Sequence, residues 1–229
     1  MAGFKLRRGN QTVAIDSDYF NLALRQKGTV RTGPLNGPNV NVRWVHFTVN
    51  GDQPILALRA PYPVALTHSV VNGDGTITYT LYGIPDSAID FDVEFWVFDL
   101  PKYGMMFTSA GKFIVRNPSS REVVFDSRMK YLKVQGFYQP DNNVTDARDF
   151  SRYPAVVQSN RAWARGTYPM SPTVTREESV TSAVWTEGNR VYGQRRNIYF
   201  MIRQKYDSDR FISYGGGLPQ TMVIDVQDY

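Results

Sequence analysis

Apolar and polar residues alternate with a period of two along much of this chain. In the segment 90–98 every odd position is apolar, and the first three even positions are acidic. Successive side chains of a β-strand point to opposite faces of its sheet, so the pattern predicts a strand with one buried face. Trp96 and Phe98 then make the second face apolar as well. The segment therefore predicts a strand that enters the core.

The same alternation predicts strands elsewhere. Two segments place three apolar residues each on an inward face: Val45, Phe47 and Val49 in 43–49, and Ile198, Phe200 and Ile202 in 197–203. Segment 70–81 predicts two strands around an Asn-Gly and an Asp-Gly, dipeptides that tolerate the positive φ of a tight hairpin. Segment 221–226 predicts the last strand.

No long segment keeps the 3.6-residue apolar spacing of a helix, and the best helix candidate is 154–165. The 13 Pro and 18 Gly interrupt the chain at short intervals. We therefore expect an all-β fold of two β-sandwich-like domains with little helix. The stretch 139–176 is rich in Pro and polar residues, and we expect it to form an irregular arm.

An internal repeat suggests where the two domains divide. Segment 12–17, TVAIDS, returns as EVVFDS at 122–127, which is 110 positions later. Each copy follows a short predicted strand and a polar turn, so we expect matching strand–turn–strand units. The spacing is about one domain length. It predicts an N-terminal β-sandwich-like domain over 1–110 and a C-terminal β domain over 111–229 that carries the arm.

Composition and charge narrow the class of function. The 229 residues contain no Cys, which excludes disulfides, thiolate metal sites and a cysteine nucleophile. The net charge of +5 is banded, at +5 over 1–60, −4 over 61–127 and +4 over 128–229. Such bands suit docking between proteins better than binding to nucleic acid, which usually needs a denser basic stripe. No apolar run approaches the roughly 18 residues of a membrane span.

Few residues of the types that form catalytic or metal sites are present. His46 and His68 are the only two histidines, and we expect them to lie far apart and to bind no metal. No motif for a cofactor is present. Asp90, Asp92 and Glu94 share one strand face, where paired carboxylates could hydrolyse a glycan or bind Ca²⁺. An acidic solvent-facing side of an edge strand explains them as well.

Two short motifs resemble those of a protein family. Tyr103-Gly104-Met105 and the strand Val123-Val124-Phe125-Asp126-Ser127, followed by an apolar strand to Val134, are similar to segments of small tailed-phage proteins. These are minor components encoded near the tail-tip and tail-fibre genes of long-tailed phages. The resemblance covers mainly 1–30 and 90–136, and the Phe-Ile-Val-Arg segment at 113–116 departs from the pattern.

The resemblance implies a structural protein of the distal tail, made in the host cytoplasm and carried in the virion, without enzymatic activity. Its implied partners are other phage tail proteins, such as a hub or fibre, and symmetric copies of itself. An alternative from the aromatic residues is a β-sandwich that binds glycans and contributes to recognition of the host surface. A third reading is a hydrolase that uses the acidic strand.

We expect the partner interface in the arm, because its apolar side chains are too many to leave in water. Trp163 lies two positions from an arginine on either side, the composition of an interface hot spot. The predicted interface residues are Phe150, Tyr153, Arg161, Trp163, Arg165 and Tyr168.

Overall fold

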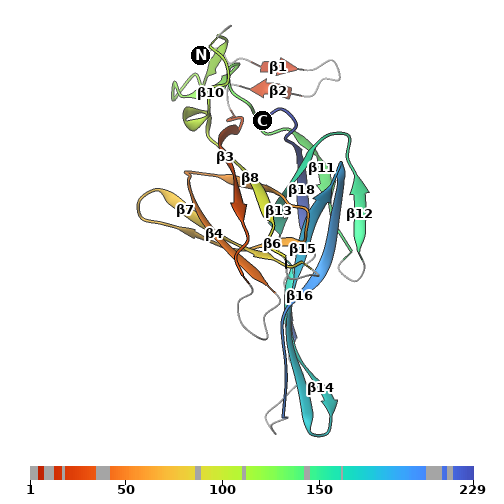
Figure 1. The fold of residues 1–229 in the computed structure, drawn as a ribbon. Coiled ribbons are helices and arrows are strands. Elements are labelled where there is room, and N and C mark those ends of the chain that lie inside the picture. Colours follow the sequence, from red (N-terminus) through yellow and green to blue (C-terminus); the bar gives the residue numbers. More distant parts are fainter. Residues whose placement is uncertain are drawn as a thin grey trace.

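A computed structural model describes residues 5–7, 13–16, 19–34, 42–85, 89–109, 112–141, 145–160, 162–204, 213–215 and 219–229. Antiparallel strands dominate these residues, and the only helix among them is the short 3-10 turn η1 (Pro101–Tyr103). The predicted all-β, sandwich-like fold is therefore confirmed (Figure 1).

Two large sheets form the body of the molecule. The first has six strands in the order β11 (Val134–Tyr138), β18 (Gln220–Asp225), β13 (Pro154–Asn160), β5 (Ile55–Arg59), β8 (Asp92–Asp99) and β3 (Ala23–Arg31). The main path of the second runs through β12 (Asp146–Asp149), β16 (Arg190–Gln204), β15 (Val174–Glu187), β6 (Val64–Val71), β7 (Thr76–Gly83) and β4 (Arg43–Asn50).

Each half of the chain contributes three neighbouring strands to each sheet, in the same order. In the first sheet β3-β8-β5 corresponds to β11-β18-β13, and in the second β4-β7-β6 corresponds to β12-β16-β15. The halves meet edge to edge where Leu58 pairs with Val156 and Val64 pairs with Val184. The fold is therefore a duplicated sandwich whose halves are related by an approximate two-fold axis.

The pairing register supports this internal symmetry. One row of paired residues crosses the first sheet as Gly28, Phe95, Leu58, Val156, Val223 and Gly136. Another crosses the second as Arg43, Gly83, Val64, Val184, Gly193 and Asp146. Glycines occupy corresponding positions in both rows. Nearby, Leu24 N donates to Lys130 O at 2.7 Å and Leu132 N donates to Leu22 O at 2.9 Å, a reciprocal pair that fits the same axis.

Two small hairpins repeat the same unit at one end of the molecule. β1 (Lys5–Arg7) pairs with β2 (Val13–Asp16), and β9 (Ile114–Arg116) pairs with β10 (Val123–Asp126). Each hairpin has three residue pairs, and the pairs of one correspond to those of the other in the same order. The register shifts at a corresponding place in each hairpin. Ile15 of the first hairpin packs with Val115 and Val124 of the second. The predicted repeat is confirmed for these strands, whereas Ser17 lies outside the described residues.

The predicted boundary near residue 110 falls between η1 and β9. Each side of it supplies its own three-plus-three arrangement of strands. Both large sheets nevertheless continue across the seam, so the two halves share their sheets rather than standing apart.

The main core lies between the two sheets. Val45 and Val49 of β4 pack there with Val93, Phe95 and Val97 of β8, as the alternation predicted. Trp96 and Phe98 belong to a second buried cluster on the other face of β8, which the C-terminal segment helps to cover through Tyr229. Burial on both faces explains why the polar alternation of this strand ends at Trp96.

An arm extends beyond the two sheets, at the lower end of Figure 1. It consists of β14 (Trp163–Ser171), β17 (Ser213–Gly215) and the outer parts of β15 and β16, and we define it as residues 163–180, 197–204 and 213–215. It belongs to the second half alone and thus breaks the internal symmetry.

Three predictions for this region were wrong. The segment 139–176 is not irregular, because it contains β12, β13 and β14, and the helix candidate 154–165 lies in two of these strands. Pro169 fits in β14 because it lies past the residues that pair with β17, at an edge of the described sheet. Phe200 and Ile202 are exposed rather than inward, since the arm has no second sheet over it among the described residues.

Candidate functional site

The predicted interface residues do not form one surface. Phe150 packs against a buried cluster that contains Tyr138 and Val156, so it belongs to the core of this chain. The Arg59 guanidinium carbon lies over the Tyr153 ring, 3.4 Å from the ring centroid. Tyr168 lies on the arm, and Arg161 is outside the described residues.

Trp163 and Arg165, by contrast, meet in a groove of about 540 Å³ at the base of the arm. The groove forms because β6 and β15 pair at Val64 and Val184 and at no other described residue. Beyond that pair, β14 takes the place of β6 beside β15, where Trp163 pairs with Thr181. We refer to this cavity as the seam groove.

The opposite wall of the seam groove comes from the first half of the chain. Tyr82 of β7 lies there, and the Trp44 ring stacks on it with centroids 5.7 Å apart and planes at 17°. Ser159 and Asn160 at the end of β13 also line the groove. Sequence analysis missed Tyr82. The alternation around Tyr82 predicts a strand, but it gives no information about contacts with residues as distant in sequence as Trp163.

The acidic residues lie on or next to a strand that is paired on both sides. β8 pairs with both β3 and β5, so the edge-strand explanation was wrong. An arginine accompanies each of the three carboxylates: Arg43 contacts Asp90, Arg31 lies 3.0 Å from Asp92, and Arg59 lies 4.0 Å from Glu94. These contacts explain the carboxylates as partners of basic residues on neighbouring strands.

The two histidines lie closer than expected. His46 of β4 and His68 of β6 pair with the same residue, Thr80 of β7, from its two sides. His46 Nδ1 is 3.0 Å from Thr80 Oγ1, and both imidazoles are exposed. The expectation that they lie far apart was wrong, because two strands distant in sequence flank β7. No group of three potential metal-ligating residues occurs in the described part of the chain.

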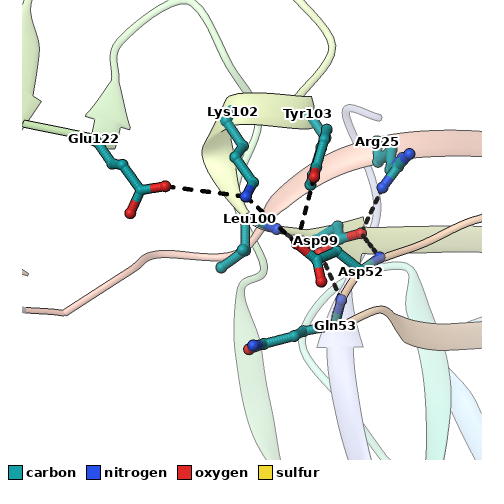
Figure 2. Close-up of polar contacts among 8 residues, drawn as sticks. All are labelled: Arg25, Asp52, Gln53, Asp99, Leu100, Lys102, Tyr103 and Glu122. Atoms are coloured by element: carbon teal, nitrogen blue, oxygen red, sulfur yellow. Dashed lines mark hydrogen bonds and ion pairs between the residues drawn. The ribbon is translucent and has the colours of Figure 1, made fainter. Parts of the chain in front are cut away.

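The most buried carboxylate of the first half is Asp99, at the end of β8 (Figure 2). It accepts hydrogen bonds from the backbone N–H groups of Asp52, Gln53 and Leu100 at 2.8, 3.1 and 2.8 Å, and from Arg25 at 2.7 Å. Burial by itself raises the pKa of the Asp99 carboxyl. These donors outweigh it and hold the pKa below its ordinary value.

The surroundings of Asp99 tie the sandwich to the hairpin end. Lys102 of η1 lies 3.4 Å from Asp52 and 3.9 Å from Glu122, which precedes β10 (Figure 2). The Tyr103 hydroxyl donates to Asp52 at 3.4 Å. Because four donors already satisfy the Asp99 carboxylate, this cluster is a structural joint rather than a site for a ligand.

The described Asp-Ser step is structural as well. Asp126 accepts from Arg128 N at 3.0 Å and from Arg128 Nη2 at 2.5 Å, and these bonds outweigh the effect of burial and lower the pKa of its carboxyl. Ser127 Oγ accepts from Phe113 N at 3.0 Å. Both side chains fix the turn that follows β10.

Comparison of the chain with protein-family models, with curated proteins and with solved structures finds no match. Among the described residues, no helix has the length and apolar character needed to cross a bilayer.

Proposed function

We propose that this chain is a structural component of a tailed-phage virion, placed at the distal tail. It attaches through the arm to other tail proteins, and it acts by burying surface rather than by catalysis. The motif resemblance at 103–105 and 123–134 supports the tail assignment. The apolar surface of the arm supports the docking.

The observation that carries this proposal is exposed apolar area on hydrogen-bonded strands. Ile202 is 56% exposed, Phe200 is 38% exposed, and Met170 near the β14–β15 turn is 57% exposed. Ile202 and Phe200 alternate along β16 and so share one face. Fully burying one such side chain is worth about 1.5–3 kcal/mol, so a partner over this face would gain several kcal/mol.

Charged groups beside these side chains suit the rim of an interface. Arg176 pairs with Ile202 across the strands and Glu178 pairs with Phe200. The two charged side chains form an ion pair of 2.6 Å, and the Arg176 guanidinium lies 6.0 Å from the Phe200 ring centroid. An apolar centre beside paired charges is the usual composition of a protein–protein contact.

Exposed large apolar side chains also occur in the β1–β2 hairpin and in the segments next to β2, η1 and β9. They are Leu6, Tyr19, Phe20, Met105, Met106, Phe107 and Phe113. The hairpins and the arm lie at opposite ends in Figure 1. A chain with docking surfaces at both ends suits a connector between neighbouring proteins of a tail, repeated in symmetric copies around its axis.

The test is incorporation of an arm variant into particles. The double variant Phe200→Ser and Ile202→Ser removes the apolar face, and we expect it to be absent from purified virions while its melting temperature stays near that of the wild type. The matched control is Val71→Ser, which removes a 76% exposed apolar side chain from the β6–β7 hairpin. Normal incorporation of the arm variant would contradict the proposal.

A further inference from the structure

We propose that the seam groove is a binding site for a neutral oligosaccharide. The inference stands on the lining of the groove and does not depend on the docking function of the arm. It rests on three features: aromatic faces on the two walls, hydroxyl groups with fixed acceptor lone pairs, and the absence of an unpaired charge among the described lining residues.

The aromatic faces come from both halves of the chain. Trp163 is 51% exposed at the start of β14, although a ring of this size is usually covered. Across the groove, Tyr82 is held by the stacked Trp44 ring, which fixes its orientation. Flat rings of this kind pack against the apolar C–H faces of sugar rings.

Three hydroxyl groups of the lining donate hydrogen bonds within the chain. Thr67 Oγ1 donates to Thr80 O at 3.1 Å, Ser159 Oγ to Gln220 O at 3.1 Å, and Thr181 Oγ1 to Ala162 O at 3.3 Å. A hydroxyl has one proton and two lone pairs, so each of these oxygens keeps acceptor capacity toward a ligand. These three acceptors favour a ligand rich in O–H donors.

The charge of the groove is balanced. Among the described residues that line it, Arg165 alone is charged, and Glu177 of β15 binds the Arg165 guanidinium through both Nε, at 3.1 Å, and Nη2. An anionic ligand would have to compete with this carboxylate. Ligand pockets typically enclose about 300–1,000 Å³, and the groove falls within that range.

The internal symmetry provides a comparison within the same molecule. The two-fold counterpart of the seam groove lies beside Thr186 and Glu187, on the other side of the Val64–Val184 pair. There Arg59 donates to Pro154 O at 2.8 Å and to Gly188 O at 3.0 Å. Charged side chains line that cavity, so we assign the neutral ligand to the seam groove alone.

The first measurement is binding of the full-length chain to an array of neutral hexose oligosaccharides, with sialylated and sulfated oligosaccharides as anionic probes. We expect binding to neutral probes and weaker binding to the anionic ones. The strongest neutral probe is then titrated by calorimetry. Absence of any neutral binder, or preference for the anionic probes, would overturn the proposal.

Variants place the binding in the groove. We expect Trp163→Ala to weaken the affinity for the neutral probe at least tenfold and Ser159→Ala to weaken it severalfold, with melting temperatures near that of the wild type. Phe137→Ala is the matched control, since it removes an exposed aromatic ring outside both the groove and the arm, and its affinity should be unchanged. Equal affinity in Trp163→Ala and wild type would refute the assignment. Loss of virion incorporation in the arm variant, by contrast, tests only the docking function.

Discussion

A single buried carboxylate joins several parts of the first half of the molecule. Asp99 receives three backbone N–H groups and the Arg25 guanidinium, which come from β3, from the turn before β5 and from the end of β8. A buried charge is tolerated when its hydrogen-bonding capacity is satisfied, and its donors then depend on it in turn. Asp225 ends the corresponding strand of the second half and contacts Arg152 at 3.3 Å.

Removing this carboxylate should destabilise the fold strongly. We expect Asp99→Ala to lower the free energy of unfolding by about 3–5 kcal/mol, because it leaves Arg25 and three N–H donors unpaired. Asp92→Ala is the control, since its ion pair with Arg31 is exposed and should contribute about 0–1 kcal/mol. Urea denaturation measures both. Equal effects of the two substitutions would show that the cluster is not a joint.

The lowered pKa of Asp99 also predicts acid sensitivity. A carboxyl whose pKa is lower in the folded state stabilises the protein above its unfolded pKa of about 4, and this stability is lost as the pH falls through the folded pKa. We therefore expect the free energy of unfolding to decrease below about pH 4. Asp99→Asn should show a shallower decrease, measured by denaturation at a series of pH values. The same pH dependence in Asp99→Asn and wild type would exclude Asp99 as a source of the acid sensitivity.

Sequence analysis identified some of these residues but not their roles. Trp163 and Arg165 were predicted because a Trp flanked by arginines has the composition of an interface hot spot, and the structure places both in the seam groove. Tyr82 and Ser159 could not be found in this way, since they come from distant strands and each looks ordinary in its own segment. The contacts of Asp99 depend in the same way on the tertiary pairing of β3, β5 and β8.

At the scale of the elements, the alternation predicted the buried faces of two body strands correctly and the buried face of an arm strand wrongly. Alternation marked the buried faces of β4 and β8 correctly, because a covering sheet makes burial follow the pattern. In the outer part of β16 the same pattern suggested burial, yet Phe200 and Ile202 are exposed. The alternation along a strand indicates which side chains share a face. Whether that face is buried depends on the tertiary packing of other elements over it.

The glycines of the two-fold rows give a prediction for the strands. A Cβ at Gly193 would lie 2.3 Å from Pro140 Cβ, so we expect Gly193→Ala to cost about 1–3 kcal/mol of stability through overpacking. Gly73 has no neighbour within 4 Å, and Gly73→Ala should have little effect. Thermal denaturation compares the two. Equal melting temperatures would mean that β12 and the segment before it do not pack closely on β16.

For the whole molecule, the duplication explains how the two halves join, and the arm is the main departure from the internal symmetry. The two halves share strand order and matching rows of pairs, and they close each other's sheet edges at Leu58–Val156 and Val64–Val184. Unpaired strand edges tend to associate with other edges. The arm extends only the second half, so one end of a symmetric body carries an additional surface.

This symmetry predicts the behaviour of the first half alone. A fragment of residues 1–110 would expose the edges of β5 and β6, which normally face their two-fold counterparts β13 and β15. We expect two fragments to pair antiparallel through the same edges and to form a dimer. Light scattering after size-exclusion chromatography measures the mass. A folded, monomeric fragment would show that the seam is not self-complementary.

The proposed docking requires that the arm is covered when the protein is in its assembly. Amide hydrogen exchange in the free protein and in purified virions tests it directly, because a covered strand exchanges more slowly. We predict that amides of 174–180 and 197–204 exchange at least tenfold more slowly in the virion, while those of the β6–β7 turn at 72–75 are unchanged. Unchanged exchange in the arm, or absence of the chain from the virion, would contradict the account.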